Sequence, residues 1–156
     1  MVPDDSVSQS KEKILADIDV AMGGHVAERM VMGTEKVTSG CGSDLQGATR
    51  MAYFAVRKAG MFGEDASWIS SDKEDTSENY NAKVDKTVKK ILDESYIRVE
   101  KLLLSKEKEL RNVSKNLYQF DYLDEEELKK VIEGKTLEKE KVRTWRKEEP
   151  EYLIKF

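Results

Sequence analysis

The sequence predicts an all-α protein, a bundle of amphipathic helices. Only two prolines occur in 156 residues, Pro3 and Pro150, so no proline prevents the chain between them from being helical. Charged residues make up 37% of the chain and hydrophobic residues 38%, a balance typical of helices with one apolar face and one long solvated face. No segment shows the regular alternation of apolar and polar residues that marks a half-buried strand.

The first predicted helix covers residues 10–32. Its apolar side chains recur near the 3.6-residue period, at Ile14, Ile18, Ala21, Met22 and Val26. Gly23 and Gly24 interrupt this helix, although each glycine costs a helix about 1 kcal/mol relative to alanine. We therefore expect another backbone to approach this pair closely, and we expect Gly33 to end the helix.

The second predicted helix follows a Gly-Cys-Gly turn at residues 40–42 and runs to about Ala59, where Gly60 ends it. Ser43 has the character of an N-cap, and Gln46 completes a capping box three residues later. One face of this helix carries small residues suited to tight packing, namely Leu45, Ala48, Ala52, Ala55, Val56 and Ala59.

A polar stretch then separates this helix from a third helical region. Residues 62–81 are rich in charged residues and serine, which predicts a mobile surface loop. From about Ala82 to Phe120 the apolar pattern is helical again. It fits either one long helix bent near Ser105 or an antiparallel pair of helices.

A short helix is predicted last. Asp124 is a good N-cap, Glu127 lies three positions after it, and Gly134 closes the helix. The tail, residues 135–156, alternates in charge and either hangs loose or docks on the rest of the protein.

The residue counts exclude several kinds of site. One cysteine, Cys41, excludes a disulfide framework within the chain and a multi-cysteine zinc site, and one histidine, His25, excludes a site built from several histidines of this chain. The net charge is −4 with interspersed signs, which argues against non-specific nucleic-acid binding. There is no apolar run of about 18 residues and no signal-peptide pattern, so no segment is expected to span or target a membrane.

Residues 21–49 carry the most specific pattern in the chain. They read AMGGHVAERMVMGTEKVTSGCGSDLQGAT. Together with KVDKTVKKILDESYIRVEKLL and LYQFDYLDEEELKKVIEGK, this segment resembles the C-terminal half of the zinc peptidase domain of FtsH-type AAA proteases. The resemblance covers about residues 2–138. It is nearest in appearance to mitochondrial i-AAA members, which implies the mitochondrial inner membrane as the location.

The resemblance implies roles for two acidic residues. In the family, the Asp of the SD-L-x-x-AT motif is the third protein ligand of a catalytic zinc, and Asp44 matches it. The Glu of the GG-x-x-AE motif lies beside the zinc and supports its ligands, and Glu28 matches it. The residues themselves leave plainer roles open. Asp44 could be a first-turn acid that favours the helix dipole, and Glu28 an exposed acid paired with a Lys or Arg.

Four further positions near this pattern bear on the site. We expect His25 to be a surface histidine and not a ligand, because the position between GG and VAE is variable. We expect Cys41 to be a small packed side chain and not a nucleophile, since the chain offers no base other than His25. The family usually has Ser where this chain has Phe62, and Glu where it has Arg29. These departures remove no ligand but leave open a divergent or inactive paralogue.

The implied function is part of an ATP-dependent zinc metalloendopeptidase that degrades unfolded or membrane proteins. In the family, two His ligands and the general-base Glu lie on an upstream HExxH helix, which we expect to be outside this chain. The ATPase module is expected to be outside it too, because no G-x-x-x-x-G-K-[ST] loop occurs here. The chain alone is therefore predicted to be inactive. Its Asp44 would bind a zinc that is shared with the absent His ligands, and ATP would be bound by the absent ATPase module. Any contact with a membrane would be made by segments outside this chain.

The same resemblance suggests a division of the chain. Residues 1–63 would form the zinc-site half of the peptidase domain, and residues 64–81 a polar loop. Residues 82–134 would supply helices for packing and for contacts in a homo-oligomer, a hexamer in the family, and residues 135–156 a charged tail.

Two other interpretations remain. The chain could be a complete protein that has lost its catalysis and serves as a helical subunit of a larger protein assembly, although such a subunit needs neither Asp44 nor Glu28. It could also be a charged bundle whose match is fortuitous, which the length and order of the matches argue against. For the isolated chain we expect poor solubility, self-association or capture by another protein, because its glycine and small-residue faces lack their cover.

Overall fold

The computed structural model describes residues 9–142, and within that range the chain is helical without a strand. The helices are α1 (Lys11–Met32), α2 (Gly42–Tyr53), α3 (Glu78–Ser105), α4 (Glu107–Phe120) and α5 (Glu125–Ile132). Two 3-10 turns, η1 (Thr34–Lys36) and η2 (Ser39–Cys41), join α1 to α2, and a π-helical turn, η3 (Phe54–Lys58), extends α2. The predicted all-α class is confirmed.

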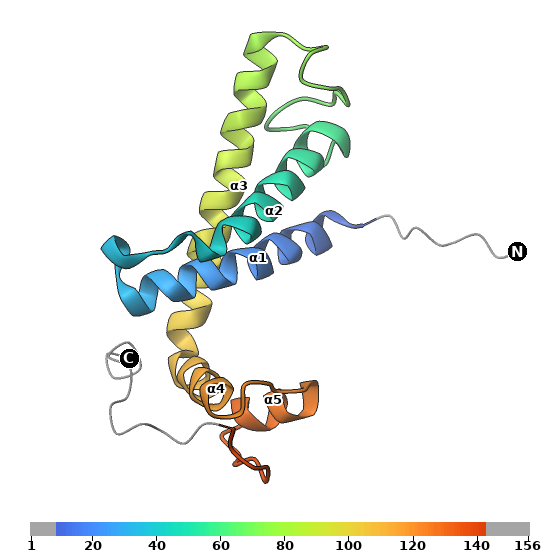
Figure 1. The fold of residues 1–156 in the computed structure, drawn as a ribbon. Helices are drawn as coiled ribbons and strands as arrows, with labels where there is room; N and C mark the ends of the chain where they lie inside the picture. The colour runs from blue at the N-terminus through green and yellow to red at the C-terminus, as the bar shows by residue number, and fades with distance from the viewer. Residues whose placement is uncertain (1–8, 143–156) are drawn as a thin grey trace, which may run out of the picture.

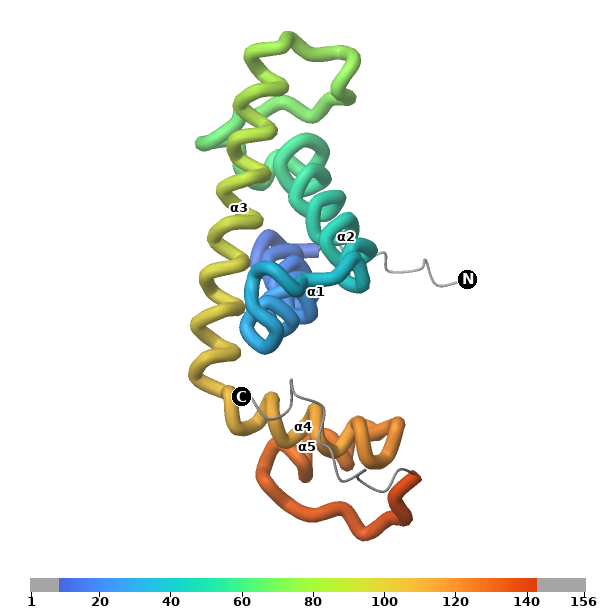
Figure 2. The backbone as a smooth tube through the Cα atoms, turned by 60° about the vertical axis from the view of Figure 1, so that its left-hand side comes forward, coloured from blue at the N-terminus to red at the C-terminus, as the bar shows by residue number. Residues whose placement is uncertain are grey.

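The helices form two parts, a body of α1, α2 and α3 and an arm of α4 and α5. Figure 1 shows α1 and α2 packed on α3, whose C-terminal end carries α4 and α5 as a pair. Lys106 leaves the helical region, with φ −118° and ψ 27°, and α4 turns away from the axis of α3 at that point (Figure 2). Because α4 packs mainly on α5 and not along α3, the bent arrangement is the correct one of the two alternatives for this region.

Helix α1 forms as its sequence predicts. The Ser10 side chain accepts a hydrogen bond from the Lys13 N–H at 3.2 Å and so caps the helix. Its buried face repeats every four residues, at Ile14, Ile18, Met22 and Val26. Gly33 ends the helix with φ 79°, a conformation that residues with a Cβ rarely adopt.

Helix α2 begins differently from the prediction. Its first residue is Gly42, so the expected N-cap Ser43 lies inside the helix, and the capping box with Gln46 does not form. The cause is the preceding turn η2, which Thr38 caps by accepting the Gly40 N–H at 3.1 Å. Gly42 already has helical angles, φ −62° and ψ −37°, so the chain enters α2 without needing the Ser43 hydroxyl.

The small-residue face of α2 is buried in the body, as predicted for most of its members. Ala48, Ala52, Ala55 and Val56 are each at most 1% exposed. Ala59 is an exception, because it lies beyond the π-helical turn and is exposed. Gly60 follows with φ 62° and ends the helical run.

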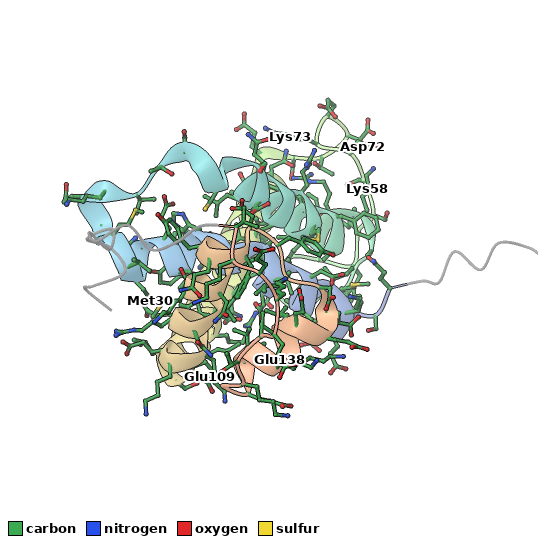
Figure 3. The ribbon with its side chains drawn as sticks, turned by 60° about the horizontal axis from the view of Figure 1, so that its bottom comes forward. Met30, Lys58, Asp72, Lys73, Glu109 and Glu138 are labelled. Atoms are coloured by element: carbon green, nitrogen blue, oxygen red, sulfur yellow. The ribbon has the colours of Figure 1, made fainter. Side chains whose placement is uncertain are left out.

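The loop between η3 and α3 is tied to both of its neighbours. Lys58 pairs with Asp72 at 2.5 Å, and Figure 3 shows both side chains at the edge of this loop. The hydroxyl of the buried Tyr80 donates to the Ile69 carbonyl at 3.1 Å. The prediction of a non-helical segment is confirmed for residues 62–77, whereas its mobility stays a prediction.

Helix α3 starts at Glu78, earlier than the expected start near Ala82. Ser77 caps it, since its hydroxyl accepts the Tyr80 N–H at 3.3 Å. The buried Arg57 of η3 donates to Asn81 at 2.8 Å and holds this first turn against α2.

Helix α5 has the predicted capping box. The Asp124 carboxylate accepts the Glu127 N–H at 2.8 Å, and the Glu127 carboxylate accepts the Asp124 N–H at 3.0 Å. The Asn112 amide of α4 donates to the Val131 carbonyl at 2.6 Å and joins the pair. Most of the predicted tail, residues 143–156, lies outside the described residues. Within residues 9–142 no helix combines the length and apolar character needed to span a membrane.

Candidate functional site

Glu28 lies near the end of α1 and holds the connection that leads back to α2. Its Oε1 accepts the Thr38 hydroxyl at 2.6 Å and the Thr38 N–H at 3.1 Å. Its Oε2 accepts the Cys41 thiol at 3.6 Å. These hydrogen bonds, led by the Thr38 hydroxyl, favour the ionised form and hold the pKa of the Glu28 carboxyl below its ordinary value.

These contacts decide between the two interpretations of Glu28 only in part. Across residues 9–142, no Lys or Arg forms an ion pair with it, so the plainer role of a surface ion pair is not seen in the described chain. Its carboxylate instead fastens the connection between α1 and α2. Support of a zinc ligand through Glu28 stays a prediction.

Cys41 is half-buried beside Glu28. Burial, followed by the charge of Glu28, raises the pKa of the Cys41 thiol above its ordinary value. A thiol that stays protonated is a weak nucleophile. This environment agrees with the predicted small packed side chain.

Asp44 projects from the first turn of α2 toward Gly24 of α1. A Cβ placed on Gly24 would stand 3.8 Å from Oδ2 of Asp44 and 3.6 Å from Sγ of Cys41. The Asp44 side chain is exposed and makes no hydrogen bond or ion pair within the part of the chain described. Both of its oxygens are therefore available to a ligand.

The glycine pair of α1 does not meet another backbone within residues 9–142. The nearest atoms to a Cβ on Gly24 are side-chain atoms at ordinary van der Waals distances, and a Cβ on Gly23 would meet open space. The expected close approach of a backbone is therefore not found in the described chain.

His25 follows this pair and is half-buried. Its Nδ1 is buried without a hydrogen-bond partner, so the expectation of a surface histidine is wrong for this ring nitrogen. His25 lies three residues before Glu28 in α1, about one helical turn away.

The acidic and metal-binding side chains around the α1–α2 connection do not make a complete metal centre. No three His, Cys, Asp or Glu side chains among residues 9–142 are arranged to hold a metal ion. A catalytic zinc takes three protein ligands and keeps a fourth position open. The free carboxylate of Asp44 fits one of those three ligands, and the other two would have to come from outside the described residues.

Thr38 is the residue of this site that sequence reasoning missed. A threonine two residues before a glycine, just ahead of a helix, is a recognisable side-chain-to-backbone turn pattern. That pattern could have identified the turn, but not the partner on α1, which lies ten residues earlier in the chain.

The family is decided by comparison with known proteins. A family model, Peptidase family M41, matches residues 1–131. The chain belongs to peptidase family M41. The predicted resemblance to FtsH-type proteases is thereby confirmed.

Several relatives in this family are ATP-dependent zinc metalloproteases by name. The chain is 35% identical over 150 residues to the ATP-dependent zinc metalloprotease FTSH 11, chloroplastic/mitochondrial, of Arabidopsis thaliana, which covers 96% of the chain and 18% of that protein. It is 34% identical over 134 residues to YME1L1 of Homo sapiens, covering 86% of the chain and 17% of that protein. It is 36% identical over 142 residues to the mitochondrial inner membrane i-AAA protease supercomplex subunit YME1 of Saccharomyces cerevisiae, covering 90% and 19%. The M41 chain thus spans less than a fifth of each of these relatives.

Proposed function

We propose that this M41 chain is the C-terminal part of the peptidase domain of an ATP-dependent zinc metalloendopeptidase, and that Asp44 is one of the zinc ligands. The observation that carries the proposal is the free Asp44 carboxylate, which stands at the family's SD-L-x-x-AT motif and points across α1 beside Gly24. The names of the relatives support the reaction class.

The chemistry at this site follows from the donors. A bound zinc lowers the pKa of its water to about 7 and polarises the scissile carbonyl. Asp44 would hold the metal at the start of α2, and Glu28 would keep that start in place through the α1–α2 connection. The chain has one histidine, so the two histidines and the general-base Glu of an HExxH helix would come from another segment or chain.

The wider assignment rests on the family. We propose that the substrates are proteins, that ATP is used by a separate module, and that the location is the mitochondrial inner membrane, as for the yeast relative. Residues 1–63 would supply the zinc-site half, residues 64–81 a polar loop, residues 82–134 the packing and hexamer contacts, and residues 135–156 the charged tail.

A second candidate is a catalytically inactive assembly subunit derived from such a protease. The lack of a three-donor metal cluster among residues 9–142 is compatible with it, and equally with a protease whose other ligands lie elsewhere. The free Asp44 carboxylate favours the protease, because an assembly subunit has no use for an unpaired acid directed across α1.

Zinc affinity of the full-length protein tests the proposal. We expect Asp44→Ala to weaken zinc binding by more than about 100-fold, because losing even an outer-shell partner costs about 10–100-fold. Glu35→Ala is the matched control, since Glu35 is an exposed acid of the same connection without an ion pair in the described chain. Wild-type zinc affinity in Asp44→Ala would overturn the ligand assignment. Zinc binding without cleavage of an unfolded protein substrate would favour the inactive subunit.

A further inference from the structure

Thr38 fixes the α1–α2 connection through both its hydroxyl and its N–H. Its hydroxyl donates to Oε1 of Glu28 at 2.6 Å, and its N–H donates to the same oxygen at 3.1 Å. The hydroxyl oxygen also accepts the Gly40 N–H at 3.1 Å. One side chain thus joins the end of α1 to the turn that starts α2.

Few other hydrogen bonds join this connection to α1. Residues 34–41 reach α1 through Thr38 and through the Cys41 thiol, both of which donate to Glu28. The Cys41 contact is longer, at 3.6 Å, and a thiol is a weak donor. Both Thr38 bonds end on a carboxylate, and the hydroxyl bond is short at 2.6 Å, so they are the stronger restraint.

The restraint is transmitted to Asp44 through a continuous backbone. Turn η2 follows Thr38 directly, and Gly42 carries the chain into α2 with helical angles. All residues from Ser39 to Asp44 therefore lie in hydrogen-bonded helical turns, Gly40 and Gly42 included. The hydrogen bonds that hold Thr38 against α1 thus determine where the Asp44 carboxylate lies relative to Gly24.

We propose that Thr38 is the positioning residue for Asp44, acting through its paired hydrogen bonds to Glu28 and through turn η2. The inference rests on the proposed function for the role of Asp44 as a zinc ligand. It goes beyond that function by assigning the geometry of the ligand to an exposed loop threonine.

Two substitutions at Thr38 distinguish the effect of its hydroxyl from the effect of its side-chain volume. Thr38→Val keeps the volume and the N–H but removes the hydroxyl, and Thr38→Ser keeps the hydroxyl. Thr34→Val is the control, because Thr34 is an exposed threonine of the same connection without a side-chain hydrogen bond in the described chain.

The first readout is Cys41, which reports the position of the connection without any metal. In the full-length protein, maleimide labelling at pH 8 is followed by mass spectrometry of the peptide that carries Cys41. We expect Thr38→Val to label about 10-fold faster, the factor that corresponds to losing a hydrogen bond to a charged group. Thr38→Ser and Thr34→Val should label at the wild-type rate.

The second readout is zinc affinity by competition with a chromophoric chelator. We expect Thr38→Val to bind zinc about 10-fold more weakly, as for loss of an outer-shell partner, with recovery in Thr38→Ser. If Asp44→Ala loses zinc while Thr38→Val keeps the wild-type affinity and labelling rate, the positioning role is wrong and the proposed function stands. If Asp44→Ala keeps its zinc, the proposed function is wrong whatever the Thr38 variants do.

Discussion

Arg98 of α3 and Asp19 of α1, 79 residues apart in the chain, form a two-pronged ion pair. Arg98 Nε donates to Oδ2 of Asp19 at 3.0 Å, and a terminal guanidinium nitrogen donates to Oδ1 at 2.8 Å. The buried Ser95 hydroxyl donates to the same Oδ1 at 2.5 Å. The carboxylate thus fixes the crossing of α1 over α3, the helix that carries the arm.

Removing this carboxylate should destabilise the body mainly through Ser95. Both charged side chains are about a third exposed or more, so solvent screens the ion pair itself. The Ser95 hydroxyl is fully buried and would lose its partner, at a cost of about 1–3 kcal/mol. We expect Asp19→Ala to lower the free energy of unfolding in urea by about 1–2 kcal/mol, and Asp19→Asn by less. An equal loss in both variants would contradict the Ser95 argument.

Two nearby apolar residues of α1 should differ strongly in how much stability their truncation costs. Ile18 is fully buried and Val20 is 80% exposed. Ile18→Ala should cost about 2–4 kcal/mol, because it removes buried methylenes and leaves a cavity between the helices. Val20→Ala, its matched control, should change the free energy of unfolding by less than about 0.5 kcal/mol. Urea unfolding followed by circular dichroism measures both, and a similar loss in the two variants would be inconsistent with this face of α1 forming the core.

The glycines of α1 should also differ. Gly23 lies inside the helix with open space around a Cβ, so Gly23→Ala should stabilise the 156-residue chain by about 0.5–1 kcal/mol. Gly33 has φ 79°, so Gly33→Ala should destabilise it by about 1 kcal/mol. Thermal or urea unfolding checks both signs.

Gly23→Ala offers a further comparison between this chain and a protein that also carries the proposed HExxH helix. If an HExxH helix packs on the glycine pair, the substitution should stabilise the isolated chain yet weaken zinc binding in the full-length protein. Equal behaviour in both proteins would argue against a helix covering Gly23.

The stability contributed by the hydrogen bonds to Glu28 should fall as the pH is lowered. The pKa of its carboxyl is below the ordinary value of 4.5 in the folded chain, so folding favours its ionised form. The stabilisation is therefore present above pH 4.5 and lost as the pH falls through the lower folded value. The Thr38 amide proton, which donates to Glu28, should titrate in an NMR spectrum with a midpoint below 4.5. Glu28→Gln should abolish this titration, and a midpoint above 4.5 would contradict the assigned contacts.

Local sequence signals predicted the helices well where each signal acts alone. The Asp124 capping box and the glycines at 33, 60 and 134 all work within one turn of the chain, and the structure has them as expected. Ser43 failed because a second cap, Thr38, had already started a helical turn upstream. Two competing caps cannot be ranked from residue types alone, since the choice depends on the partner of Thr38 on α1.

The candidate site was predictable as residues but not as contacts. Asp44 and Glu28 were found through a motif, whereas the bonds between Glu28 and Thr38 join segments that only the folded chain brings together. The buried Nδ1 of His25 was missed for the same reason, because burial of that nitrogen depends on packing and not on the residues beside it in the sequence.

The π-helical turn at the end of α2 has a consequence for how the family can vary in length. Its wide hydrogen bond, from the Ala59 N–H to the Phe54 carbonyl at 2.9 Å, accommodates one residue more than a regular helical turn. This lets Ala55, Val56 and Arg57 all be buried in succession. Deleting a single residue here would restore ordinary α-helical winding and leave the part of α2 before the turn in nearly the same register with Gly60. Three successive residues could then no longer all face the core, and Arg57 would lose its hydrogen bond to Asn81, so the extra residue of this turn is what joins the end of α2 to the first turn of α3.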